Sequence, residues 1–173
     1  MSCILTAAIA ANCRDGKGGI SNLWAVELGA VTGGTSIETD GALTALALEG
    51  SKVMFAWNFA KNSAGIMEDM NSELESGTTF WRHTLEVSFW KWETAKRNEF
   101  KIAATTPICF VAKDFNDQYW VVGKDRGMDM QSGSQAMSGK LLGDKNGYTL
   151  TFASDEPQPV IEVTDSTFID ALP

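Results

Sequence analysis

The longest regular pattern in the chain is an alternation of apolar and polar side chains across residues 78–90. A period of two predicts a β-strand with one buried face. At about 3.3 Å per residue this strand would be roughly 40 Å long, about twice the usual length. A strand of that length in a small protein has to lie in a large sheet or project to pair with another chain. One face of the strand carries Trp81, His83, Leu85, Val87 and Phe89. The other face carries Arg82, Thr84, Glu86 and Ser88.

The preceding segment, residues 63–74, fits two kinds of secondary structure. Its apolar residues are Ala64, Ile66, Met70 and Leu74. In a strand these residues share one face, which Glu68 interrupts. In a helix the last three recur at every fourth residue, with Ser63 as the N-cap and Gly77 as the C-terminal stop. We expect the strand, paired with residues 78–90 in a hairpin, and the helix is the alternative.

Shorter patterns predict the remaining elements. Apolar runs between glycine-rich and asparagine-rich turns predict strands at residues 20–31, 43–48, 53–59, 108–112, 118–122, 148–152 and 160–163. Residues 91–104 lose the alternation and predict an amphipathic helix, whose apolar stripe is Trp92, Ala95, Ile102 and Ala103. Residues 127–143, rich in Gly, Ser, Met and Gln, indicate a strand edge followed by a mobile loop. Residues 155–159 indicate a rigid connector.

The expected fold is therefore mainly β with one α-helix, arranged as a β-sandwich or barrel with a long hairpin. The whole chain, residues 1–173, is expected to be a single domain with an N-terminal arm and a C-terminal tail from residue 164. A length of 173 residues, 44% hydrophobic residues and six Trp suit a globular domain with a full core.

Charge and cysteine content narrow the possible partners. The net charge of −8 means that the overall field of the protein does not attract DNA or anionic lipid. No run of about 18 apolar residues is present, so no membrane-spanning segment is expected. Cys3, Cys13 and Cys109 are expected to be reduced thiols of a protein made in the cytosol, with a Cys3–Cys13 bridge left open. Residues 4–11 are apolar, but no Lys or Arg precedes them, which argues against a signal peptide.

The candidates for reaction chemistry are weak, and we expect no catalytic, cofactor-binding or metal-ligating residues. His83, the single histidine, lies on the apolar face of the predicted strand, which favours a packed or interface histidine over a general base. The glycine-rich residues 16–19 lack the P-loop spacing, and residues 114–117 lack the glycine and distal glutamate of an EF-hand. Asp125 and Asp129 are interpreted as acids on a solvated edge.

The tryptophans near the long strand could stack on bases or sugars, but stacking platforms for single-stranded nucleic acids come with a basic groove. Residues 61–90 contain five acids against Lys61 and Arg82, which favours packing in the core or between subunits. The predicted subunit-interface residues are Trp81, His83, Leu85, Val87, Phe89 and Trp92.

Several local sequences resemble small virion structural proteins of phages that infect Bacteroidetes, and the order of elements resembles tail tube proteins of tailed phages. The resembling segments are Cys13-Arg14-Asp15-Gly16 with Gly18-Gly19-Ile20, then residues 94–100, Tyr119-Trp120-Val121-Val122-Gly123, residues 144–152, and Glu156-Pro157. They cover turns, strands and the predicted helix, so the resemblance carries over no catalytic residue.

The resemblance implies a subunit that stacks with its copies as rings, expected to be hexameric, in a tube through which DNA passes without specific binding. Other virion proteins would be its partners, and its location would be the virion tail after synthesis in the host cytoplasm. Asp69, Glu73 and Glu75 would then be acids that face the lumen. The alternatives are a head decoration or connector protein, a carbohydrate-binding β-sandwich that uses exposed tryptophans, and an enzyme.

Overall fold

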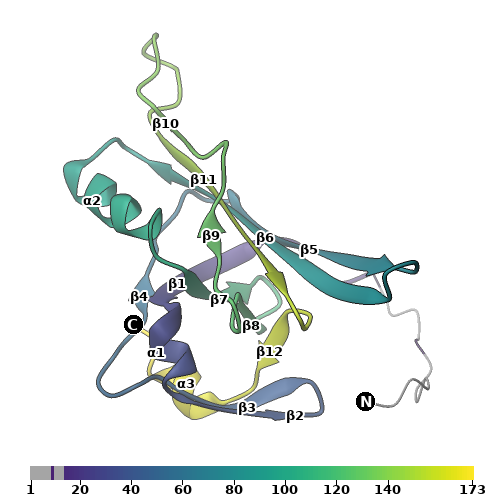
Figure 1. Cartoon of the computed structure of the whole chain (residues 1–173). Coiled ribbons are helices and arrows are strands. Elements are labelled where there is room, and N and C mark those ends of the chain that lie inside the picture. Colours follow the sequence, from purple (N-terminus) through teal and green to yellow (C-terminus); the bar gives the residue numbers. More distant parts are fainter. Residues whose placement is uncertain (1–8, 10–13) are drawn as a thin grey trace.

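The computed structural model describes residue 9 and residues 14–173, and this part of the chain forms two β-sheets packed face to face (Figure 1). The larger sheet has the strand order β2-β3-β12-β8-β7-β1-β4. The smaller sheet has the order β10-β11-β6-β5, and β9 also pairs with β11. The expected mainly β fold is confirmed, and the two packed sheets correspond to a sandwich.

The larger sheet consists of β1 (Ile20–Glu27), β2 (Thr35–Thr39), β3 (Ala42–Ala47), β4 (Phe55–Ala56), β7 (Ile108–Asp114), β8 (Tyr119–Val122) and β12 (Ile161–Val163). The smaller sheet consists of β5 (Ala64–Glu73), β6 (Thr78–Trp90), β9 (Asp129–Met130), β10 (Gln135–Met137) and β11 (Gly147–Glu156). The helices are α1 (Leu28–Thr32), α2 (Thr94–Ala103) and α3 (Ser166–Asp170).

The main core lies between the two sheets. Side chains of β6 and β11 such as Leu85 and Phe152 meet side chains of β1 and β7 such as Leu23 and Phe110, and all four are buried. Trp57, which follows β4, joins the two halves, because its ring lies 5.4 Å from that of Phe110 and 5.9 Å from that of Phe152. Aromatic contacts at such distances add to the free energy of burial and hold the sheets together at this end.

A second core covers the other face of the larger sheet. Trp24 and Val26 of β1 point into it and are packed with α1, α3 and β3. Residues 108–112 of β7 are therefore buried on both sides, which explains why that strand is a continuous apolar run without alternation. Cys109 lies in this core as a free thiol, and burial raises its pKa to about 12. Cys3 and Cys13 lie outside the described residues.

The long hairpin has the expected secondary structure. The strand expected at residues 78–90 is β6, and the segment before it is the strand β5, so the helical alternative is wrong. Glu73 pairs with Thr78 at the start of the hairpin loop. Gly77 in this loop has φ +65°, a conformation that glycine adopts without strain.

Other boundaries differ from the expectation. The strand expected at residues 20–31 ends at Glu27, and the helix α1 follows, with Ala30 and Val31 buried. The strand expected at residues 53–59 is reduced to the two residues of β4. Short apolar runs have no period that distinguishes a strand from a helix or a coil, so packing determines the result. The strand β2 was missed because all five of its residues are exposed and no apolar pattern marks it.

The C-terminal expectations also need correction. Residues 155–156, expected in a connector, extend β11, and Glu156 is buried. The expected tail contains α3, which packs through Phe168 against the larger sheet. The chain end itself is held by a hydrogen bond from Trp24 Nε1 to the backbone oxygen of Pro173, at 2.9 Å.

The helix expected at residues 91–104 is α2, but only Ala103 of its expected apolar stripe is buried. Trp92 precedes the helix, and Ala95 and Ile102 are exposed. Phe100, which was not expected in the stripe, faces the core beside Ala103, with its ring 4.9 Å from that of Tyr148 and 5.1 Å from that of Phe89. The helix contacts the core only through its C-terminal half, so the residues of that half determine which face is buried. None of the described helices is long and apolar enough to cross a membrane.

Candidate functional site

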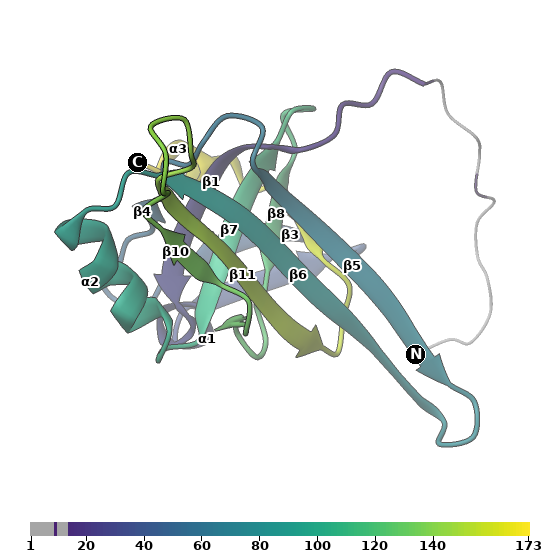
Figure 2. The same cartoon turned by 90° about the horizontal axis from the view of Figure 1, so that it is seen from above.

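The hairpin β5–β6 is the most distinctive surface feature of the molecule, because it extends beyond the sandwich (Figure 2). The β6 residues nearest β11 are buried on their inner face, whereas Thr78, Thr79 and Phe80 near the loop are exposed. Met70 is 79% exposed and Leu74 is 94% exposed. The distal half of the hairpin thus presents apolar side chains that the rest of the chain does not cover.

One long edge of this hairpin is available for strand pairing. Within the described residues, β5 pairs with β6 alone and ends the smaller sheet. Ser88 N donates to Ser63 O at 3.1 Å, which sets the alternation of hydrogen-bonded pairs along the hairpin. In an antiparallel pair every second residue directs its N–H and C=O away from the partner. The outward residues are Ala64, Ile66, Glu68, Met70 and Ser72. A free edge of this length is a template for pairing with another chain.

A buried polar cluster lies where the hairpin leaves the sandwich. His83 of β6 is 2% exposed, and its Nε2 lies 3.4 Å from Glu68 Oε2 on β5 without a hydrogen bond. Glu156 of β11 is buried beside it and accepts hydrogen bonds from the backbone N–H groups of Asp125 and Arg126. Burial lowers the pKa of His83, and the nearby Glu156 and Glu68 oppose that shift without cancelling it.

This cluster explains the residue that interrupted the apolar pattern of β5. Glu68 lies opposite His83 in the hairpin register, and its carboxylate accepts a hydrogen bond from Val160 N. It therefore ties the hairpin to the segment that leads into β12. No group of three or more His, Cys, Asp or Glu side chains that could hold a metal ion occurs among the described residues.

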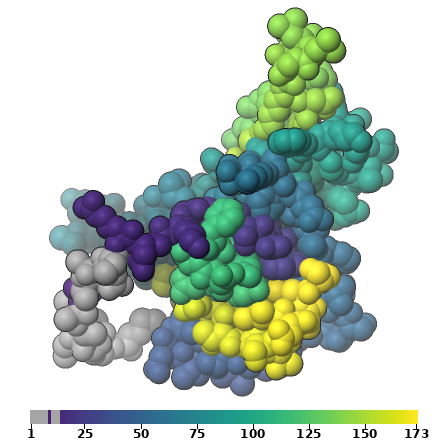
Figure 3. All heavy atoms as spheres, turned by 180° about the vertical axis from the view of Figure 1, so that it is seen from behind, coloured from purple at the N-terminus to yellow at the C-terminus, as the bar shows by residue number. Residues whose placement is uncertain are grey.

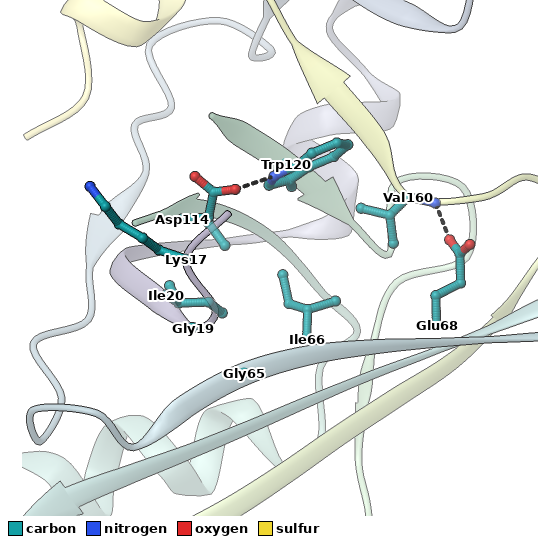
Figure 4. A pocket seen from close by; sticks show the side chains of 10 residues that line it. Lys17, Gly19, Ile20, Gly65, Ile66, Glu68, Asp114, Trp120 and Val160 are labelled. Atoms are coloured by element: carbon teal, nitrogen blue, oxygen red, sulfur yellow. Dashed lines mark hydrogen bonds between the residues drawn. The ribbon is translucent and has the colours of Figure 1, made fainter. Parts of the chain in front are cut away.

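A cleft opens between the sheets beside β5, with a volume of about 380 Å³ (Figure 4). Its walls combine the apolar Ile20, Ile66 and Val160 with the polar Asp114 and Lys17. The Asp114 carboxylate accepts hydrogen bonds from the backbone of the β7–β8 turn and from Trp120 Nε1, at 3.3 Å for the latter. Burial raises the pKa of this carboxyl, but the hydrogen bonds outweigh burial and lower it. The acid is thus engaged in the structure of the turn.

The opposite end of the molecule carries exposed tryptophans. Trp90, the last residue of β6, is 69% exposed, and Trp92 is 44% exposed with the Arg97 guanidinium 6.0 Å from its ring centroid. A pocket of about 280 Å³ beside them is lined by Asn58, Phe59, Ala60, Lys61, Trp90 and Lys96. This end combines aromatic surface with several basic side chains.

The segment between β10 and β11 stands out from the body of the molecule (Figure 3). Leu141 and Leu142 in this segment are exposed. The Asp144 carboxylate accepts hydrogen bonds from the backbone N–H groups of Lys140 and Leu141, and these hydrogen bonds lower its pKa. The loop predicted at residues 127–143 thus contains two short strands and a locally hydrogen-bonded tip.

The expected interface residues are divided between the core and the surface. His83, Leu85, Val87 and Phe89 are buried inside the chain's own sandwich, so a second copy cannot contact their side chains unless the sandwich opens. Trp81 is half-buried near the projecting part, and Trp92 is exposed at the opposite end. The apolar alternation identified the correct buried face, but that face packs against β1 and β7 of the same chain.

The three acids expected to face a lumen, Asp69, Glu73 and Glu75, are all exposed on the projecting hairpin. Sequence reasoning missed the two features that distinguish this region, the exposed Leu74 at the loop and the free edge of β5. The sequence contained a signal for Leu74, since it is an apolar residue between Glu73 and Glu75 next to the expected turn. No match was found among protein-family models, curated proteins or solved structures.

Proposed function

We propose that this chain is a virion structural subunit that assembles with copies of itself into stacked rings of a phage tail tube that conducts DNA. The single observation that carries the proposal is the free edge of β5 on a hairpin that extends beyond its own sandwich. β5 contains no proline, and within the described residues no strand pairs with its outer edge, so its outward backbone groups can pair with another chain. Pairing with a neighbouring copy would satisfy the outward backbone groups of β5.

The charge of the protein supports the DNA-conducting part of the proposal. The net charge of −8 and the exposed acids of the hairpin repel the phosphate backbone, so DNA can pass without being retained. The expected partners are further copies of this chain, expected as hexameric rings, and other virion proteins. No reaction chemistry is assigned to the protein.

The proposal is tested by removing one outward N–H group from the free edge. Ser72 directs its N–H away from β6, so Ser72→Pro leaves the hairpin ladder intact but removes a donor that a neighbouring strand needs. We expect wild-type protein to form rings or tubes in electron micrographs and the Ser72→Pro variant to sediment as a monomer. Ser72→Ala is the matched control, because it loses the same hydroxyl and keeps the N–H.

A head decoration or connector protein would use the same edge but form rings or patches that do not stack into tubes. The second alternative, a carbohydrate-binding sandwich, is favoured by the exposed Trp90 and Trp92. In that case the wild-type protein would stay monomeric at all concentrations and glycans would change its tryptophan fluorescence. A concentration-independent monomer would rule out the assembly proposal.

A further inference from the structure

The two ends of the long strand β6 carry opposite charge. Among residues 64–80, the hairpin has four acids, Glu68, Asp69, Glu73 and Glu75, and no Lys or Arg. At the other end, Lys61 and residues 90–101 supply five basic side chains against Glu93 and Glu99. This region is basic although the protein as a whole has a net charge of −8. The basic side chains are Lys61, Lys91, Lys96, Arg97 and Lys101.

The basic end also has a concave site. The pocket of about 280 Å³ is lined by the apolar Phe59 and Trp90 and by the basic Lys61 and Lys96. Lys96 is held in place, since its Nζ donates to Trp90 O at 2.6 Å and lies 3.2 Å from Glu93 Oε2. The site therefore combines an apolar surface with two lysines, one of which is held by Trp90 and Glu93.

The hairpin loop has the complementary chemistry. Leu74 is 94% exposed and lies between Glu73 and Glu75 in the sequence. An apolar side chain flanked in the sequence by two acidic residues complements an apolar pocket whose lining includes two lysines. Burying a leucine side chain is worth roughly 1.5–3 kcal/mol, and complementary charges mainly set orientation and association rate.

We propose that the tip of the β5–β6 hairpin of one copy docks into the Phe59, Trp90 and Lys96 pocket of a second copy. The hairpin loop lies at one end of β6 (Figure 2), and Trp90 of the pocket is the last residue at the other end, so a molecule cannot fill its own pocket. Contacts between two different surfaces are heterologous and propagate from copy to copy, closing as a ring or continuing as a tube. The inference rests on the proposed self-assembly and names a contact that would carry it.

The test reverses the charge of each surface in the full-length protein. The tip variant is Glu73→Lys with Glu75→Lys, and the pocket variant is Lys61→Glu with Lys96→Glu. Each variant alone is expected to raise the concentration needed for half-assembly by about tenfold or more, measured by sedimentation velocity. An equimolar mixture of the two is expected to recover assembly, because a reversed tip matches a reversed pocket.

The control is Glu38→Lys with Asp170→Lys, which makes the same change in net charge at two exposed acids away from the hairpin and the pocket. It is expected to assemble like wild type. Leu74→Ser is a second variant that does not depend on the pocket variant folding, and it is also expected to weaken assembly by about tenfold. Near-wild-type assembly of the tip variant or of Leu74→Ser overturns the docking contact while self-assembly stands. A wild-type protein that does not assemble overturns both.

Discussion

At the scale of single residues, the buried His83 lies where the hairpin leaves the body of the protein. Its imidazole has Glu68 and Glu156 as nearby carboxylates but lacks a hydrogen bond to either. The negative charge of Asp125, in the β8–β9 connection, also acts to raise the pKa of His83. A buried imidazole in such a site is neutral at neutral pH, because burial penalises its charged form.

Because the pKa of His83 is lower in the folded protein than its ordinary value of 6.5, the unfolded chain takes up this proton first as the pH falls. The free energy of unfolding is therefore expected to decrease as the pH falls below about 6.5, and the decrease ends below the folded-state pKa. Urea unfolding followed by tryptophan fluorescence between pH 7.5 and 5 would measure this slope.

His83 is the single histidine of the chain, so the slope in this pH window has one assignable source. The control variant His83→Gln retains a neutral polar side chain at every pH and is expected to show a flat profile over the same range. An equally steep profile in His83→Gln would show that other groups produce the pH dependence.

At the scale of secondary-structure elements, the helix α3 depends on one capping residue. The Asp165 carboxylate accepts hydrogen bonds from Thr167 N and Phe168 N at the start of α3 and from Leu46 N on β3. It thus joins the helix to the larger sheet. The hydrogen bonds lower the pKa of Asp165, with the bond from Leu46 N as the largest cause.

Asp165→Ala is expected to destabilise the protein by about 1–2 kcal/mol, because N-cap removal leaves backbone donors without a partner. Thermal or urea unfolding would measure the change. The control is Asp170→Ala, an exposed acid at the other end of the same helix, which is expected to change the stability by less than about 0.5 kcal/mol. Equal effects of the two substitutions would contradict the capping role.

At the scale of the whole molecule, the sandwich and the projecting half of the hairpin differ in how much they contribute to the core. The buried part of β6 lies between β11 and β5 in the smaller sheet and packs against the larger sheet, whereas the distal part is exposed. Loss of the distal part should therefore remove the proposed interaction surface without removing core contacts.

Replacing residues 70–81 by Asn-Gly tests this division. Asp69 and Arg82 are paired in the hairpin, and a two-residue Asn-Gly turn connects such a pair without strain. The shortened protein is expected to unfold cooperatively at a temperature within a few degrees of wild type, measured by circular dichroism, and to remain monomeric in sedimentation. A shortened protein that still assembles would show that other surfaces carry the contact.

Local patterns determined much of the architecture. The alternation from Trp81 to Phe89 was sufficient to identify β6 and its buried face, because side chains of a strand alternate between its two faces whatever it packs against. The hairpin between Ile108 and Val122 was recognisable for the same reason, since turn residues act over a few positions. The turn expected at residues 144–147 was placed too late, because the chain turns at residues 141–144 and Gly147 already begins β11.

Tertiary structure alone decided which partner covers each face. The sequence placed Leu85 and Val87 at a subunit interface, and the fold placed them against β1 and β7 of the same chain. It also decided that β5 is an edge strand and that residues 28–32 form a helix. These outcomes depend on contacts between residues far apart in the chain, and a periodic pattern records only that a face is buried. The amino-acid sequence therefore determined the strands and their faces, and three-dimensional packing determined which of them remain open to a partner.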